Sequence, residues 1–228
     1  MICRQRYNIK TKGGAFFNAF RGTKSCGYTV FSLLTKQKES TPRALSRENF
    51  EKLRDLEIPE KRRSHIITKD LFLFACYTGT AYADAASITR ENLFTDDGGS
   101  LWLKYRRKKT DYLGRVKLLP EAVALIEKYR DDTRETLFPP QDYHTLRGNM
   151  KALRLMAGLS QDLVYHMGRH SFASLVTFEE GVPIETISKM LGHSNVRTTQ
   201  IYARVSPKRL FEDMDRFIEA TRDLKLIL

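Results

Sequence analysis

Two short segments near the C-terminus concentrate the side chains that could do chemistry. Residues 166–171 read HMGRHS and residues 191–202 read LGHSNVRTTQIY, so that three of the five histidines fall within them. A tyrosine hydroxyl can attack phosphorus, while arginine and histidine neutralise the charge that develops on the phosphate oxygens. Tyrosine, histidine and arginine around one phosphate could therefore act together to transfer a phosphoryl group.

The elements around these segments must bring the side chains together. His166 and Arg169 are three residues apart and share one face of a helix, where the guanidinium can grip two phosphate oxygens in a fork. An apolar stripe then predicts a buried helix over 183–190, which Gly192 ends, leaving His193 on an exposed turn.

Ser194 would cap a further helix over 195–203 that carries Tyr202. Taken singly, Tyr202 reads as a packing residue and His193 as a capping or surface residue, and His170 reads as structural, holding the start of its helix. The joint pattern favours a site.

Composition and charge narrow the class of partner. The 228 residues carry a net charge of +12, which favours nucleic acid, and 41% hydrophobic residues suffice for a core. The three cysteines lack paired spacing, which argues against a disulfide framework or a zinc site and suits a reducing cytoplasm. No apolar run approaches the roughly 20 residues that span a bilayer, so no membrane attachment is expected.

The pattern along the chain predicts a mostly α domain with a small antiparallel β-sheet, an α+β fold. Residues 1–40 contain no acidic residue before Glu39 and read as a basic arm. Two strands in 100–120 would be joined by a turn around Asp111 and Gly114. The predicted helices cover 41–56, 68–88, 120–130, 141–157, 169–179, 183–190, 195–203 and 207–224. The last has an apolar stripe that either packs on its own domain or docks on a second protomer.

The sequence HMGRHSFASL, followed by GVPIETISKMLGHSNVRTTQIYARV, closely resembles the C-terminal signature of tyrosine recombinases, the phage-type integrase family. That signature is His-x-x-Arg-His, then Leu-Gly-His, then a tyrosine nine residues beyond that histidine. The segments LFACYTGTAYADAASIT and RRKKT are similar to the Thr-Gly-x-Arg helix and the hairpin lysine of the family, so the resemblance covers roughly residues 41–220. It implies a recombinase catalytic domain over 41–228, with a C-terminal docking helix. Residues 1–40 would be a basic arm or the remnant of a DNA-clamping domain.

The resemblance also implies a role for each matched residue. Tyr202 would form a 3′-phosphotyrosyl link to DNA, and Lys109 would protonate the departing 5′-oxygen. Arg169, His166 and His193 would hold the phosphate oxygens, with His170 and Gly192 as structural neighbours. No metal or cofactor is implied. The expected partners are double-stranded DNA and further copies of the chain in a tetramer, in a bacterial-type cytoplasm at the nucleoid.

One position departs from the family pattern. Ala81 stands where the family has an arginine, and loss of one preorganised donor typically slows a reaction by about 100- to 1000-fold. Arg90 would point away on a continuing helix, whereas Arg107 would share a strand face with Lys109 and could supply the lost charge. Gly168, where a larger apolar residue is common, is a smaller departure that affects local helix rigidity.

Three functions follow from these observations. The first is a site-specific recombinase that integrates or excises a mobile element. A type IB topoisomerase shares the chemistry, but the short chain and the Leu-Gly-His signature favour the recombinase. The second is a catalytically impaired family member that binds DNA. The third is a regulator in which residues 183–202 form a helix-turn-helix.

Overall fold

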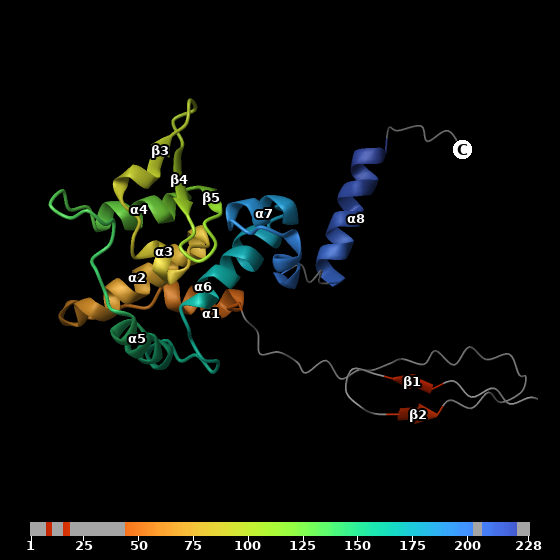
Figure 1. Ribbon diagram of the computed structural model, residues 1–228, viewed down its shortest axis with the longest axis horizontal. Helices are drawn as coiled ribbons and strands as arrows, with labels where there is room; N and C mark the ends of the chain where they lie inside the picture. Colours follow the sequence, from red (N-terminus) through yellow and green to blue (C-terminus); the bar gives the residue numbers. More distant parts are fainter. Residues whose placement is uncertain (1–7, 11–15, 19–43, 203–206, 223–228) are drawn as a thin grey trace, which may run out of the picture. The chain divides into compact units, whose positions relative to one another are not determined.

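The computed structural model describes residues 8–10, 16–18, 44–202 and 207–222 (Figure 1). The chain divides into two units, Met1–Ser40 and Thr41–Leu228. In the first unit, β1 (Asn8–Lys10) pairs antiparallel with β2 (Phe16–Asn18), with Asn8 opposite Asn18. These three-residue strands lie in a weakly periodic stretch and were not predicted. Most of the basic arm lies outside the described residues.

The second unit is built around a buried helix, α2 (Arg63–Thr78) (Figure 1). It packs against α4 (Pro120–Lys128), α5 (Tyr143–Met156) and α6 (His166–Ser171). Every residue from Leu71 to Thr78 is buried, so this helix is apolar on all sides. It ends at Gly79, whose φ of +70° is the left-handed conformation that suits a glycine after a helix. The predicted single helix over 68–88 is therefore two helices, with α3 (Tyr82–Ala85) after the break.

The remaining helices of the core follow the predicted amphipathic segments. Ser46 caps α1 by accepting a hydrogen bond from the Asn49 N–H at 3.2 Å, as expected. Asp142 caps α5 in the same way through Thr145. The bounds are α1 Arg47–Arg54, a 3₁₀ turn at Glu60–Arg62, α4 Pro120–Lys128 and α5 Tyr143–Met156.

A three-stranded antiparallel sheet lies on one side of these helices, in the order β3 (Leu93–Thr95), β4 (Leu101–Arg106), β5 (Leu113–Lys117). Leu103 and Tyr105 alternate with exposed Lys104 and Arg106, so one face meets the core and the other meets solvent. The short β3 follows a 3₁₀ turn at Arg90–Asn92 and was not predicted. Gly114 lies within β5 rather than in the turn, where Tyr105 leaves no room for a Cβ. The mostly α fold with a small antiparallel sheet is confirmed.

Helix α6 (His166–Ser171) continues into a π-helical segment, Phe172–Phe178. Thr177 donates its hydroxyl hydrogen bond to the carbonyls of Phe172 and Ala173, which matches this wider winding. The helix starts three residues earlier than predicted, so Arg169 lies in its middle.

Gly168 allows α6 to approach α2 closely. A Cβ at this position would lie 2.9 Å from the Cβ of Ala75 and 3.1 Å from the carbonyl oxygen of Phe72. The glycine therefore permits close helix packing.

Helix α7 (Ile184–Met190) is followed by two 3₁₀ turns, Val196–Thr198 and Gln200–Tyr202, so the predicted helix over 195–203 is wrong in its described part. Asn195, not Ser194, provides the cap, because its side chain accepts a hydrogen bond from the Arg197 N–H at 2.9 Å. Helix α8 (Pro207–Thr221) is amphipathic, and its apolar residues Leu210, Phe211, Met214, Phe217 and Ile218 are exposed. In the part of the chain that the structure describes, no helix is both long and apolar enough to cross a membrane.

Candidate active site

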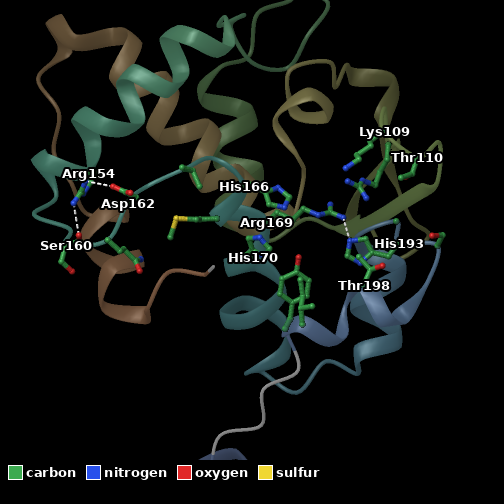
Figure 2. Close-up of a pocket in the computed structure, with 18 residues that line it drawn as sticks. Lys109, Thr110, Arg154, Ser160, Asp162, His166, Arg169, His170, His193 and Thr198 are labelled. Atoms are coloured by element: carbon green, nitrogen blue, oxygen red, sulfur yellow. Dashed lines mark hydrogen bonds and ion pairs between the residues drawn. The ribbon is translucent and has the colours of Figure 1, made fainter. Parts of the chain in front are cut away.

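One cavity of about 890 Å³ gathers the residues singled out in the sequence (Figure 2). His166, Arg169 and His170 come from α6, Gly192 and His193 from the turn after α7, and Tyr202 from the last 3₁₀ turn. Lys109 and Arg107 come from the β4–β5 turn. Segments up to 95 residues apart thus meet around one space.

Arg169 is the rigid centre of the cavity wall. Its side chain is 1% exposed and donates hydrogen bonds to the carbonyl of Gly79 at 2.6 Å and that of Leu191 at 2.7 Å. A third contact of 2.9 Å joins Nη2 to His193 Nε2 (Figure 2). Burial lowers the pKa of the guanidinium, but arginine stays protonated in proteins. These three hydrogen bonds leave up to two of the five N–H groups for a ligand.

His193 is held in one tautomer by its two neighbours. Because arginine only donates, Nε2 must accept from Arg169, so the ring proton is on Nδ1 and points to Thr199 Oγ1 at 2.9 Å. Burial, with the nearby charges of Arg169 and Arg107, lowers the pKa of His193 to about 4. The ring is therefore neutral near pH 7, and it is partly buried rather than on the exposed turn that the sequence predicted.

A row of rings leads from His166 to Tyr202. His166 meets His170 edge to face at a centroid distance of 4.6 Å, and His170 lies 5.2 Å from the Tyr202 ring. His170 is 7% exposed and contacts both of the other rings. Tyr202 also packs against the small cluster that includes Phe172, Ile187 and Leu191. Its ring is thus placed by packing, and it lines the cavity.

The β4–β5 turn brings two cations to the cavity, although not as predicted. β4 ends at Arg106, so Arg107 and Lys109 lie in the turn and do not share a strand face. Buried Asp84 fixes this turn, since it accepts a hydrogen bond from the Lys108 N–H at 2.9 Å and lies 3.8 Å from Arg107 Nε. Arg107 is 11% exposed, and its Nε has no hydrogen-bond partner among the described residues. Lys109 is exposed at the cavity rim.

Gly192 permits the turn to approach the histidine. Its φ is +62°, and a Cβ there would lie 3.2 Å from Arg107 Cδ and 3.3 Å from the Gly114 nitrogen. A glycine is therefore required both by backbone conformation and by close contact. It brings Arg107 and His193 to the same wall.

The position without the family arginine lies outside the residues that line the cavity. Ala81 precedes α3 and is partly buried. Arg90, which the sequence analysis rejected as a substitute, is half exposed and pairs with Asp132 at 2.6 Å. Arg107 lines the cavity and Arg90 does not, so Arg107 is the better placed of the two.

Two residues that position the site were not singled out from the sequence. Thr199, which is fully buried, accepts the hydrogen bond from Nδ1 of His193, and Asp84 holds the turn that carries Arg107. Thr199 could have been found from its position in the segment that contains Tyr202. Asp84 could have been found because it is a single acidic residue in an apolar stretch. At the far end of the cavity, Arg154 pairs with Asp162 at 2.6 Å (Figure 2). Among the described residues, no cluster of side chains could hold a metal ion.

Comparisons with known proteins identify the family of this chain. The sequence model of the phage integrase family matches residues 43–209. The integrase of Escherichia phage P2 is 28% identical over 142 residues, which cover 62% of this chain and 39% of that protein. Tyrosine recombinase XerA of Thermococcus kodakarensis is 27% identical over 182 residues, covering 77% of this chain and 62% of the relative. The chain thus spans less than two thirds of these relatives.

Solved structures share the fold. The XerH site-specific recombinase bound to difH substrate superposes with a TM-score of 0.58 at 21% identity, covering 76% of this chain and 54% of that one. A lambda integrase fragment bound to a core site superposes with a TM-score of 0.56 at 18% identity, covering 73% of this chain and 61% of that one. Since the family match spans most of the chain and the folds agree, this chain belongs to the phage integrase family of tyrosine recombinases.

Proposed function

We propose that this chain is a site-specific DNA recombinase that cleaves and rejoins strands through Tyr202, in the integration or excision of a mobile element. The observation that carries the proposal is the meeting of Tyr202, Arg169, His166, His193 and Lys109 around one cavity. The Tyr202 oxygen attacks phosphorus, and the bond to the 5′-oxygen breaks as that oxygen takes a proton from Lys109. The product is a 3′-phosphotyrosyl link, which a 5′-hydroxyl can attack to rejoin the strand.

The cations have distinct parts in this reaction. The remaining N–H groups of Arg169 bind the non-bridging oxygens, and its anchoring to two carbonyls means that little reorganisation is needed. His166 binds a second oxygen and accepts the proton of Tyr202. His193 orients Arg169, and it would donate to phosphate only after its proton moves to Nε2 or the ring is protonated.

Arg107 would replace the arginine that is absent at position 81. Its buried guanidinium lies in the cavity wall, with an Nε that has no hydrogen-bond partner in the described part of the chain. Asp84 orients it without a close hydrogen bond. A phosphate oxygen in the cavity would pair with the charge of this guanidinium, since Arg107 lines the cavity.

The proposal extends to assembly. In α8, five large apolar side chains are about half exposed or more, which is unfavourable for a helix without a partner. We propose that this stripe docks on a second copy of the chain when four active sites assemble on two DNA duplexes. Such a protein would work in the cytoplasm, at the nucleoid.

The alternative of a helix-turn-helix regulator has less support, because residues 195–202 form two 3₁₀ turns where a recognition helix would be needed. An experiment distinguishes an active recombinase from a catalytically impaired member of the family. The chain is incubated with restriction fragments of DNA from its source organism and run on a denaturing gel. A covalent adduct is expected in the wild type and in Tyr143→Phe, a control at an exposed tyrosine, but not in Tyr202→Phe. If no protein forms an adduct, the catalytic proposal fails.

A further inference from the structure

The solvent face of the β4–β5 hairpin is strongly cationic. Lys104 and Arg106 in β4, with Arg115 and Lys117 in β5, are all exposed. Residues two apart in a strand share a face, so the four side chains project from the same side of the sheet. The opposite face, with Leu103, Tyr105 and Val116, is buried.

The arrangement places like charges side by side. Lys104 lies directly opposite Arg115 in the register, and like charges in directly opposite positions destabilise a hairpin. Among the described residues, no carboxylate forms an ion pair with Lys104, Arg115 or Lys117. Arg106 has only the exposed Asp111, at 3.3 Å, which contributes little in water.

Two aromatic side chains lie on the same face as the cations. Next to the cations, Phe94 and Trp102 stack on each other at a centroid distance of 6.2 Å, and Trp102 donates to Asp96 at 2.7 Å. These two aromatic rings therefore pack against each other. Two carboxylates lie next to the four cations, Asp96 beside Trp102 and Asp111 beside Arg106, so positive charge remains in excess. Long flexible cations suit a row of phosphates.

The hairpin also connects this face to the cavity. Lys109, in the turn of the same hairpin, lines the cavity, and Lys104 is five residues before it. At about 3.4 Å per residue the separation is at most about 17 Å. A duplex with one phosphate in the cavity would therefore have further phosphates within reach of the hairpin.

We infer that the outer face of the β4–β5 hairpin, through Lys104, Arg106, Arg115 and Lys117, is a contact surface for the phosphate backbone of duplex DNA flanking the cleaved position. The contact is independent of sequence, because the four groups carry charge and reach phosphates rather than base edges. It neutralises the repulsion that the free hairpin contains. The inference rests on the proposed function only in taking DNA as the substrate.

The test compares two double variants that remove the same charge. Lys104→Gln with Arg115→Gln removes the opposed pair, whereas Arg47→Gln with Lys52→Gln removes two exposed cations of α1 that pair with glutamates. The dissociation constant of each protein for a 40-bp duplex of arbitrary sequence is measured between 50 and 400 mM salt. Since each phosphate contact contributes about 0.9 to the slope of log K against log salt, the hairpin variant should lose about 1.8. The α1 variant should keep the wild-type slope.

Thermal unfolding of the free proteins provides the second readout. The hairpin variant should melt at the wild-type temperature or slightly above it, because a repulsive pair has been removed. An unchanged slope in the hairpin variant, or an equal loss in both variants, would overturn the inference. The outcome is separate from that of the proposed function, since adduct formation by Tyr202 is not needed for salt-dependent binding.

Discussion

Protonation of His193 should destabilise the folded chain. Burial and the nearby charges of Arg169 and Arg107 hold the ring neutral in the folded state, with a pKa of about 4, while the ring accepts a hydrogen bond from Arg169 and donates one to Thr199. In the unfolded chain the pKa returns to about 6.5. Between these values the unfolded state binds more protons, so the free energy of unfolding must fall as pH falls from 6.5 to 4.

The size of the effect follows from the difference of about 2.5 pKa units, 6.5 minus 4. At about 1.36 kcal/mol per unit this sets an upper limit near 3 kcal/mol. The ring is only partly buried, and solvent screening reduces the figure to the order of 2 kcal/mol. Above pH 6.5 the group contributes no pH dependence.

The measurement is urea unfolding of the full chain at half-unit steps from pH 7 to pH 4, for the wild type and for His193→Gln. Glutamine can still accept from Arg169 and donate to Thr199, but it does not titrate in this range. Other groups titrate alike in both proteins, so the difference between the two curves isolates the histidine. The wild type should lose about 2 kcal/mol more than the variant. Parallel curves would refute the reasoning, because His193 would then have the same pKa folded and unfolded.

Three further predictions concern positions that the structure explains. Thr199→Val leaves the Nδ1–H of His193 without an acceptor, so urea unfolding should show a loss of about 1–3 kcal/mol. ¹⁵N NMR should still show the Nδ1–H tautomer, because Arg169 continues to require that Nε2 accepts. Thr199→Ser should restore the stability, and wild-type stability in the valine variant would contradict the hydrogen bond to Nδ1. Gly168→Leu forces α6 away from Ala75 and should cost about 1–3 kcal/mol in urea unfolding, whereas wild-type stability would contradict the close packing. Arg107→Ala should slow cleavage of a nicked suicide substrate by about 100- to 1000-fold, and near-wild-type cleavage would remove its role as the substitute cation.

Much of the fold could be predicted from local pattern. Ser46 and the apolar spacing after it predict α1, and the stripe at Ile184 and Ile187 predicts α7, because capping and helical periodicity act over a few residues. The break at Gly79 was missed, since the apolar run continues past it and only the left-handed φ ends the helix. β3 was missed because three residues carry too little alternation to stand out.

The residue types of the candidate site could be predicted from the sequence, but its local geometry could not. The spacing of the signature predicted that Tyr202, Arg169 and His193 share one site, and all three line one cavity. The helix expected to carry Tyr202 is two 3₁₀ turns, because the side chains of Asn195 and Thr199 make local hydrogen bonds. Such long-range and side-chain contacts have no periodic signal in a sequence.

The positions of Arg107 and Lys109 at the cavity also could not be derived from sequence periodicity. Arg107 was predicted to share a strand face with Lys109, yet both lie beyond the end of β4. Asp84, far away in sequence, determines the conformation of the turn by accepting from Lys108. Strand periodicity therefore led to a correct location for an incorrect reason.

The central claim is that the oxygen of Tyr202 becomes bonded to DNA phosphorus. The most direct measurement is mass spectrometry of the trapped adduct after digestion with nuclease and trypsin. The account predicts a nucleotide attached through phosphate to the peptide TTQIYAR, residues 198–204, with fragmentation placing it on Tyr202. A nucleotide on any other residue, or an unmodified peptide from a reaction that cleaves DNA, would contradict it.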